Sequence, residues 1–198
     1  MKIVLATNNN HKVEEFKSGF AAKGLDAEIV TIRQTGFSGD IVEDKDTFEG
    51  NALIKAKALA EFTGMIAIAD DSGLVVDALG GAPGVFSARY AGENATDKEN
   101  NEKLLKELEN CPEGERSGRF VCVICAYRPD GKTLFVRGES EGEIICAPRG
   151  DGNFGYDPIF YYPPFKKTFA EMTMEEKGSI SHRGKAIEKL LEQIDFFG

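Results

Sequence analysis

Short blocks of apolar residues, separated by polar segments, divide the chain into stretches of different periodicity. Six blocks are rich in apolar and β-branched residues, a pattern typical of buried strands. The strands are expected at residues 2–6, 27–32, 65–69, 119–127, 132–140 and 142–148. The third strand is expected to end at Asp70 and Asp71, where Ser72 and Gly73 would turn the chain. A turn at residues 129–131 (Pro-Asp-Gly) separates the fourth block from the fifth.

Between these blocks, apolar residues recur at helical spacing. Two helices are expected to begin at capping boxes, one formed by Asp46 and Glu49 and the other by Thr96 and Glu99, and Gly64 is expected to end the first. The apolar faces of the helices are expected to comprise Val13, Phe16 and Phe20 near the N-terminus, Leu104, Leu105 and Leu108 after Thr96, and Ile187, Leu190, Leu191 and Ile194 in a final helix capped by Ser181. Because strands and helices mix without strict alternation, we expect one α/β domain over residues 1–198, with a mixed sheet.

Composition fits this architecture and disfavours several classes of protein. The 198 residues are 41% hydrophobic and 29% charged, as in an ordinary globular domain. A formal net charge of −9 disfavours a general nucleic-acid-binding surface. No apolar stretch approaches the ~20 residues that span a bilayer, and the N-terminal apolar run is typical of a strand rather than an export signal. We therefore expect a cytoplasmic protein with no membrane or nucleic-acid partner.

The cysteines favour packed core thiols over metal or redox chemistry. Cys122 and Cys125 form a C-x-x-C, but inside a strand pattern, in which residues three apart face opposite sides of the sheet. His11 and His182 are the only histidines available to complete a zinc site. Few cysteines and no export signal again suggest a cytosolic protein.

Two adjacent aspartates raise the main chemical question. Two unit charges about 4 Å apart repel by roughly 4 kcal/mol at an effective dielectric constant of about 20. Water, a proton or a cation must relieve that repulsion between Asp70 and Asp71, and an acidic turn in solvent is the simplest arrangement. Because neighbouring residues on an extended chain point apart, the two carboxylates are not equivalent. Spacing alone does not say which of them acts as a base.

Two polar segments in the first third of the chain can receive phosphate. The loop at residues 7–12 lies between a strand and a helix, where backbone N–H groups and the helix dipole favour anions, although such a loop can equally be a helix cap. Glu43 lies in an acidic stretch, and Thr47, Asn51 and Lys55 form one polar row along the following helix. That row is either a solvated face or a surface from which the Lys55 ammonium points at an anionic group.

A glycine-rich loop near residue 150 can present a planar surface. Its G-x-G-x-x-G, at residues 150–155, is rejected as a dinucleotide fingerprint because an extended aromatic segment follows it instead of a helix. Phe154, Tyr156 and Asp157 form either a stacking surface for a base, with a carboxylate beside it, or an aromatic packing loop.

A basic group lies at the start of the final helix. Lys177 precedes Ser181 by four residues, and His182 and Arg183 occupy the first helical turn. Cations are unfavourable at a helix N-terminus. Because no structural reason for the basic pair is visible in the sequence, ligand binding is suspected here, although a lone histidine is more often structural.

Together these segments resemble one known family. The motifs TNNNHK, ED-x-x-TF-x-x-NA-x-x-KA, ADDSGL-x-VD-x-LGG-x-PG-x-x-SARYAG, FGYDPIF and SHR-x-x-A are similar, in order, to those of the inosine triphosphate pyrophosphatase family, hydrolases of non-standard purine nucleoside triphosphates. The match runs from Lys2 to about Leu191, and the block at residues 69–92 is highly specific. The resemblance implies an elongated mixed central sheet flanked by helices, two lobes with a cleft between them, and a homodimer.

The resemblance also implies an activity and a site. The expected reaction is Mg²⁺-dependent hydrolysis of ITP, dITP and XTP to the nucleoside monophosphate and pyrophosphate. Asp71 is the expected catalytic base, and Glu43, Asp70 and Asp71 are the expected metal ligands. The substrate is expected to contact Thr7, Asn8, Asn9, Asn10, His11, Lys12, Lys55, Ser72, Arg89, Phe154, Gly155, Tyr156, Asp157, Lys177, His182 and Arg183. Asn8 and Asn153 stand where many relatives have glycine, and asparagine tolerates the same positive φ.

Selectivity and two alternative functions follow from the same residues. Donors from Lys177, His182 and Arg183 would favour the oxygen at position 6 of hypoxanthine and xanthine over the amino group of adenine, a distinction worth roughly 10⁴-fold. One alternative is a non-catalytic nucleotide sensor, which would bind dITP without turnover. The other is a protein-binding α/β module, which would bind no nucleotide.

Overall fold

The computed structural model describes residues 1–152 and 154–198, except for the side chain of His11, and in this part of the chain contains one seven-stranded mixed sheet. The strands are β1 (Lys2–Leu5), β2 (Glu28–Thr31), β3 (Ile66–Val76), β4 (Ser117–Tyr127), β5 (Thr133–Ile144), β6 (Phe160–Tyr162) and β7 (Lys167–Thr168). Their order in the sheet is β2-β1-β3-β4-β5-β6-β7. β1 pairs in parallel with β2 and β3, whereas β6 pairs antiparallel with β5 and β7.

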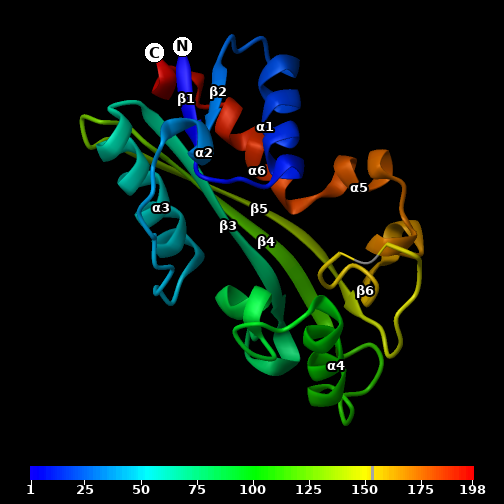
Figure 1. Ribbon diagram of the computed structural model, residues 1–198. Coiled ribbons are helices and arrows are strands. Elements are labelled where there is room, and N and C mark those ends of the chain that lie inside the picture. The colour runs from blue at the N-terminus through cyan, green and yellow to red at the C-terminus, as the bar shows by residue number, and fades with distance from the viewer. Residues whose placement is uncertain (153) are drawn as a thin grey trace. The chain divides into compact units, whose positions relative to one another are not determined.

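Six α-helices accompany the sheet in the described residues (Figure 1). They are α1 (Asn10–Ala22), α2 (Ile32–Thr35), α3 (Phe48–Thr63), α4 (Asp97–Glu107), α5 (Met174–Ile180) and α6 (His182–Leu191). Short 3₁₀ turns occupy Asp77–Leu79, Gly84–Arg89, Pro163–Phe165, Phe169–Glu171 and Ile194–Phe197. None of the helices in the described ranges has the length and apolar character needed to cross a bilayer.

The chain divides into two compact units. Unit 1 comprises Met1–Asp71, Cys122–Gly138 and Arg183–Gly198, and unit 2 comprises Ser72–Val121 and Glu139–His182. The strands β3, β4 and β5 contribute residues to both. The single domain over residues 1–198 and the cleft between two lobes stay predictions.

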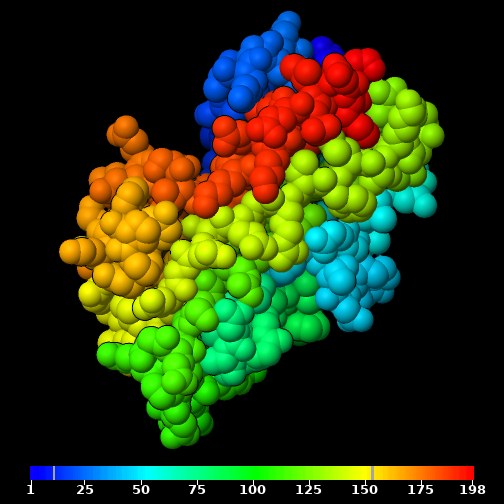
Figure 2. All heavy atoms as spheres, turned by 180° about the vertical axis from the view of Figure 1, so that it is seen from behind, coloured from blue at the N-terminus to red at the C-terminus, as the bar shows by residue number. Residues whose placement is uncertain are grey.

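The core of unit 1 lies between the sheet and the helices α1 and α6. Phe16 of α1, Ile68 of β3 and Leu190 of α6 are fully buried there. Figures 1 and 2 show α1 (blue) and α6 (red) side by side, and Figure 1 shows α3 on the opposite face of the sheet. The two helices approach closely at Gly19, where a Cβ would lie 2.5 Å from Cγ2 of Ile187. Any larger residue at this position would require the Ile187 side chain to move.

The core of unit 2 is aromatic and is closed by α4. Leu104 of this helix and Leu108, its C-cap residue, are fully buried. The ring of Phe120 stacks on Phe169 at a centroid distance of 5.4 Å and lies 4.6 Å from that of Phe160. Such ring pairs add specific geometry to the burial of apolar area, so this core holds the segments after β5 in place.

Most helix boundaries agree with the sequence patterns, with one shift. Thr96 and Glu99 form the predicted capping box, and Gly64 ends α3 in a left-handed conformation with φ of 67°. The predicted box at Asp46 and Glu49 is wrong, because Thr47 is the cap of α3 and its hydroxyl accepts a hydrogen bond from Gly50 N.

Two strands run further than predicted. β3 does not end at the aspartates, because apolar residues resume after them and Leu74 and Val76 are fully buried in unit 2. The two strands predicted at 132–140 and 142–148 are one strand, β5, within which Gly142 continues the ladder. Ile194, predicted on the buried face of the last helix, lies beyond α6 and is 42% exposed.

The glycine in β5 is required by the strand beside it. A Cβ on Gly142 would lie 2.5 Å from the carbonyl oxygen of Tyr161 and 2.6 Å from the ring of Phe160. We therefore expect Gly142→Ala to lower the free energy of unfolding by about 1–3 kcal/mol, the usual cost of overpacking. The measurement is urea unfolding at neutral pH. Gly178→Ala, in α5 with open space around the new methyl group, is the control and should gain about 0.5–1 kcal/mol. Equal stabilities of the two variants would contradict this account of Gly142.

Candidate active site

The alternation of β3 sends the two adjacent aspartates to opposite faces of the sheet. Ile68 belongs to the core beneath α1 and α6, so Asp70, two residues further along, faces the same side. Asp71 faces the side covered by α3 together with Ala69. The repulsion between the two carboxylates is therefore relieved by two separate sets of partners.

Asp70 is a buried carboxylate held by two cations. Its Oδ2 lies 2.8 Å from Nζ of Lys12, in α1, and 3.3 Å from Nε of Arg183, in α6. Nη1 of Arg183 in turn lies 2.8 Å from Glu15. Burial alone would raise the pKa of Asp70, but Lys12 and Arg183 outweigh it and hold the pKa well below its usual range. Asp70 is thus an ionised anchor for two basic side chains.

Arg183 therefore has a structural reason to lie in the first turn of α6. No such reason is visible in the sequence, and the position of Arg183 at a helix N-terminus therefore does not by itself indicate ligand binding. The ion pairs with Asp70 and Glu15 compensate for the unfavourable helix dipole at this position.

Asp71 lies among groups from α3 and the segment before it. Its Oδ2 accepts a hydrogen bond of 3.1 Å from Nδ2 of Asn51. Because Oδ1 of Asn51 accepts from the backbone N–H of Lys45, the amide can only present its NH₂ group to Asp71. Nζ of Lys55 lies 2.7 Å from Glu43 and 3.9 Å from Asp71, so one ammonium joins two carboxylates. The polar row along α3 is not a solvated face, since Asn51 is fully buried.

The loop before α1 caps that helix. Oγ1 of Thr7 accepts from Asn9 N, and Oδ1 of Asn9 accepts from the backbone N–H of Lys12 at 3.4 Å. Oδ1 of Asn8 accepts from Arg33 N, which ties the loop to α2. The capping interpretation is confirmed for Asn9, and the same loop carries Lys12 into the site. Asn10 is the first residue of α1.

In unit 2, the loop after residue 153 and the helix α5 bring together three of the residues predicted to bind the purine base. Lys177 of α5 forms a short ion pair with Asp157, and its Nζ lies 5.5 Å from the ring centroid of Phe154. Burial raises the pKa of Asp157, and Lys177 opposes that shift. Phe154 is 62% exposed, so an aromatic face is presented beside a charged pair.

The remaining predicted residues have separate places. His182 stacks on Phe120 at 5.1 Å between ring centroids. The guanidinium of Arg89 lies over the Phe86 ring at 5.3 Å, and Ser72 follows Asp71 in β3. The side chain of His11 and all of Asn153 lie outside the described residues.

Comparison with known proteins identifies the family. A model described as the Ham1 family matches residues 3–193. The chain belongs to the Ham1 family.

Ham1 relatives of known name and structure cover almost the whole chain. A dITP/XTP pyrophosphatase of Desulforamulus reducens is 52% identical over 98% of this chain and 96% of its own length. A dITP/XTP pyrophosphatase of Shigella flexneri is 49% identical over 98% of each. The solved Ham1 protein of Staphylococcus aureus is 43% identical, covers 100% of both chains and superposes with a TM-score of 0.92. The family predicted from the sequence motifs and the α/β fold class with its mixed sheet are both confirmed.

Two carboxylates of this Ham1 chain have the donor chemistry that a divalent metal requires. Nucleotide pyrophosphatases typically use a divalent metal. Among the described residues, no three histidine, cysteine, aspartate or glutamate side chains gather as a ligand cluster. Glu43 and Asp71 nevertheless fit, because their oxygens already converge on one cation, the Lys55 ammonium. Mg²⁺ is often held by only one or two carboxylates together with water and phosphate oxygens. Asp70, the third predicted ligand, faces the other side of the sheet, where it pairs with Lys12 and Arg183, so Glu43 and Asp71 are the two carboxylates carried into the proposal below.

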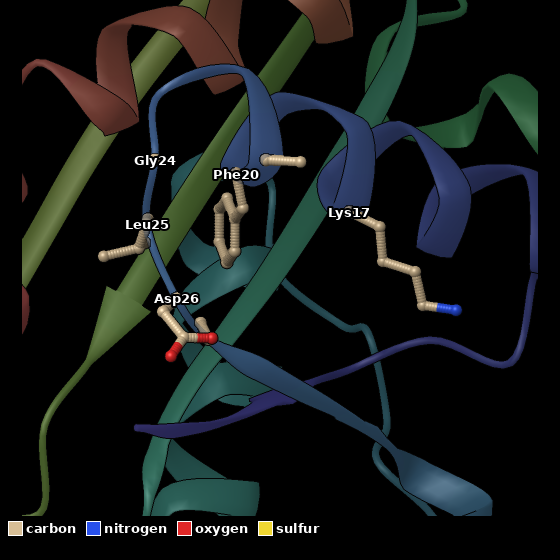
Figure 3. Close-up of a pocket in the computed structure, with 7 residues that line it drawn as sticks. Lys17, Phe20, Gly24, Leu25 and Asp26 are labelled. Atoms are coloured by element: carbon tan, nitrogen blue, oxygen red, sulfur yellow. The ribbon is translucent and has the colours of Figure 1, made fainter.

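Two other features carry no site chemistry. The thiols of Cys122 and Cys125 are buried in β4, and burial raises the pKa of Cys125 to about 12, as expected for core thiols. A cavity of about 400 Å³ in unit 1 lies where α1 leads to β2, with Phe20, Leu25 and Asp26 among its lining residues (Figure 3). As far as the structure is described, its lining includes none of the predicted site residues.

Two residues of the candidate site were not predicted as contacts of its charged groups. Asn51 was visible in the polar row of α3, and its position at i−4 from Lys55 was the available signal. Glu15 had no such signal, since its partner Arg183 is 168 residues away.

The charge state of Asp70 yields a stability prediction. Its folded-state pKa is depressed, so its stabilising contribution is complete above the unfolded pKa of about 3.9 and is lost as the pH falls further. We expect Asp70→Asn to lower the free energy of unfolding by about 3 kcal/mol at neutral pH. The difference in unfolding free energy between the variant and the wild type should become smaller in acid. Urea unfolding over a pH series measures both. The exposed Asp195→Asn is the control, with a change within about 0.5 kcal/mol. A gap for Asp70→Asn that is independent of pH would rule out this role.

Proposed function

We propose that the protein hydrolyses ITP, dITP and XTP to the nucleoside monophosphate and pyrophosphate, and so removes non-canonical purines from the nucleotide pool. The observation that carries the proposal is the Asp71–Lys55–Glu43 group, in a chain 52% identical to a protein named dITP/XTP pyrophosphatase. The reaction requires attack of water on the α-phosphorus, with pyrophosphate as the leaving group. Asp71 is the proposed base that takes the proton from this water.

The residues around Asp71 serve binding and charge compensation. Asn51 fixes the direction of the Asp71 carboxylate through their hydrogen bond. Lys12 and Lys55 compensate negative charge on the triphosphate, and the positive end of the α1 dipole contributes at the start of that helix. Glu43 and Asp71 are the residues that would hold Mg²⁺, which when bound would polarise phosphoryl oxygens and offset charge on the leaving pyrophosphate.

The residues proposed to bind the purine base are Phe154–Asp157, Lys177, His182 and Arg183. Phe154 offers an exposed ring for stacking, and Lys177 lies near it as a donor. Donors of this kind favour the oxygen at position 6 of hypoxanthine and xanthine over the amino group of adenine. Ser72 and Arg89 complete the proposed substrate contacts.

The proposal includes a cytoplasmic setting and a homodimer, without nucleic-acid or membrane partners. The net charge of −9 supports the absence of a nucleic-acid partner. The homodimer rests on the family resemblance alone.

The first test is the identity of the products. With dITP and Mg²⁺ we expect dIMP and pyrophosphate in equal amounts, measured by ion-exchange chromatography and an enzymatic pyrophosphate assay. Release of dIDP and orthophosphate would contradict the proposed chemistry. Tight dITP binding without turnover would instead indicate a nucleotide sensor. If the protein binds no nucleotide at all, a protein-binding module would be indicated.

The second test concerns the base. Asp71→Asn keeps the side-chain size and the contact with α3 but removes the proton acceptor, so kcat for dITP should fall by about 10²–10⁴-fold. Isothermal titration calorimetry should still detect dITP binding. Asp40→Asn, at an exposed position, is the matched control and should keep wild-type kcat. Wild-type turnover by Asp71→Asn would refute the assigned role.

A further inference from the structure

Two side chains of α4 hold the loop that carries the proposed base-binding residues. Oδ2 of Asp97 accepts a hydrogen bond of 2.7 Å from Gly155 N, and Nδ2 of Asn101 donates one of 2.8 Å to Gly155 O. Asp97 and Asn101 are four residues apart and therefore share one face of the helix. This pair, called here the α4 clasp, holds both backbone polar groups of a single glycine.

Gly155, the residue held by the α4 clasp, determines the backbone conformation of a tight turn. Gly155 has φ of +54°, a conformation that other residues rarely adopt. A Cβ on it would meet no atom within 4 Å, so conformation rather than space selects glycine here. The carbonyl of Phe154 accepts from Asp157 N at 3.1 Å and closes the turn. The clasp therefore fixes the turn that has Phe154 at one end and Asp157 at the other.

A second support holds the same turn through Tyr156. The hydroxyl of Tyr156 donates to the carbonyl of Ser87 at 2.8 Å, and Oγ of Ser87 accepts from Leu74 N, in β3. Tyr156 and Asp157 are buried, whereas Phe154 remains mostly exposed. The hydrogen bonds thus fix the backbone of the turn, while the ring of Phe154 remains exposed to solvent.

The asparagine of the clasp is costly for stability. Asn101 is 8% exposed, and its Oδ1 is buried without a hydrogen-bond partner among the described residues. A buried unsatisfied acceptor costs about 1–3 kcal/mol. A residue that departs from optimal packing in this way is explained better by function than by stability.

The aspartate of the clasp contributes charge as well as geometry. Asp97 is the first residue of α4 after the Thr96 cap, where the helix dipole favours a carboxylate. Its bond to Gly155 N is charge-assisted. After burial, its charge is among the influences that raise the pKa of Asp157. The clasp therefore affects both the position and the electrostatics of the loop.

We propose that Asp97 and Asn101 are positioning residues that hold the Phe154–Asp157 turn in the conformation that binds the purine base. The inference rests on the proposed function and adds to it the residues that organise base recognition. Removing either member frees one side of Gly155 and lets the Phe154 ring move relative to Asp157 and Lys177. That movement does not change the residues proposed to bind the triphosphate, so the loss of affinity is specific to small molecules that carry a purine base.

The test compares a ligand with a base and a ligand without one. Asp97→Ala and Asn101→Ala should each raise the KM for dITP about tenfold, the effect of one charge-assisted or well-aligned hydrogen bond, with kcat within about threefold. The inhibition constant of inorganic tripolyphosphate, measured against dITP by dIMP release, should stay within about twofold of wild type. Asp97→Asn retains an acceptor for Gly155 N and should recover most of the loss.

Lys98→Ala is the matched control, since Lys98 lies on the exposed face of α4, paired with Glu102. It should leave both constants unchanged. An unchanged KM in both alanine variants, or an equal rise in the KM and the tripolyphosphate constant, would overturn the inference while leaving the proposed function intact. A wild-type protein that releases no dIMP would overturn the proposed function and the inference with it. Thermal melting monitors folding, and if one alanine variant does not fold, the other decides.

Discussion

The period of two along β3 is the constraint on which the site depends. Two carboxylates adjacent in sequence would repel strongly on one surface, but an extended strand directs them to opposite faces. Asp70 thereby enters the layer between the sheet and α1 and α6, where Lys12 and Arg183 neutralise it. Asp71 faces α3, where Asn51 donates a hydrogen bond to it and the Lys55 ammonium lies nearby. Asp70 is therefore an ion-paired anchor, and Asp71 is the carboxylate that we propose for the chemistry.

The Asp70 anchor also positions two of the proposed substrate contacts, Lys12 and Arg183. Asp70 holds the N-terminal turns of two helices through one carboxylate, because Lys12 lies in the first turn of α1 and Arg183 in the first turn of α6. Glu15 fixes the other side of Arg183. Basic side chains that are ordered before a polyanion binds lose less conformational entropy on binding. In unit 2, the α4 clasp performs the corresponding ordering for the loop at Gly155.

Local patterns in the sequence predicted much of this arrangement, and long-range contacts account for what they missed. The apolar period before Asp70 was enough to show that the two aspartates differ, but their partners lie up to 113 residues away in the chain. The break predicted between residues 140 and 142 was wrong, because no local signal reports that β6 lies against the strand at Gly142. The strand after the aspartates was missed because two charges interrupt an apolar pattern that resumes at Leu74. The motif resemblance supplied the roles that spacing left open.

The most direct test of the division between the two aspartates is an NMR titration of their side-chain carboxyl carbons. The account predicts that Asp70 stays ionised far below the pH at which ordinary aspartates are protonated. It also predicts that added Mg²⁺ shifts the carboxyl resonances of Asp71 and Glu43 while leaving that of Asp70 in place. An Asp70 that titrates like an exposed aspartate, or a Mg²⁺-induced shift confined to Asp70, would contradict it.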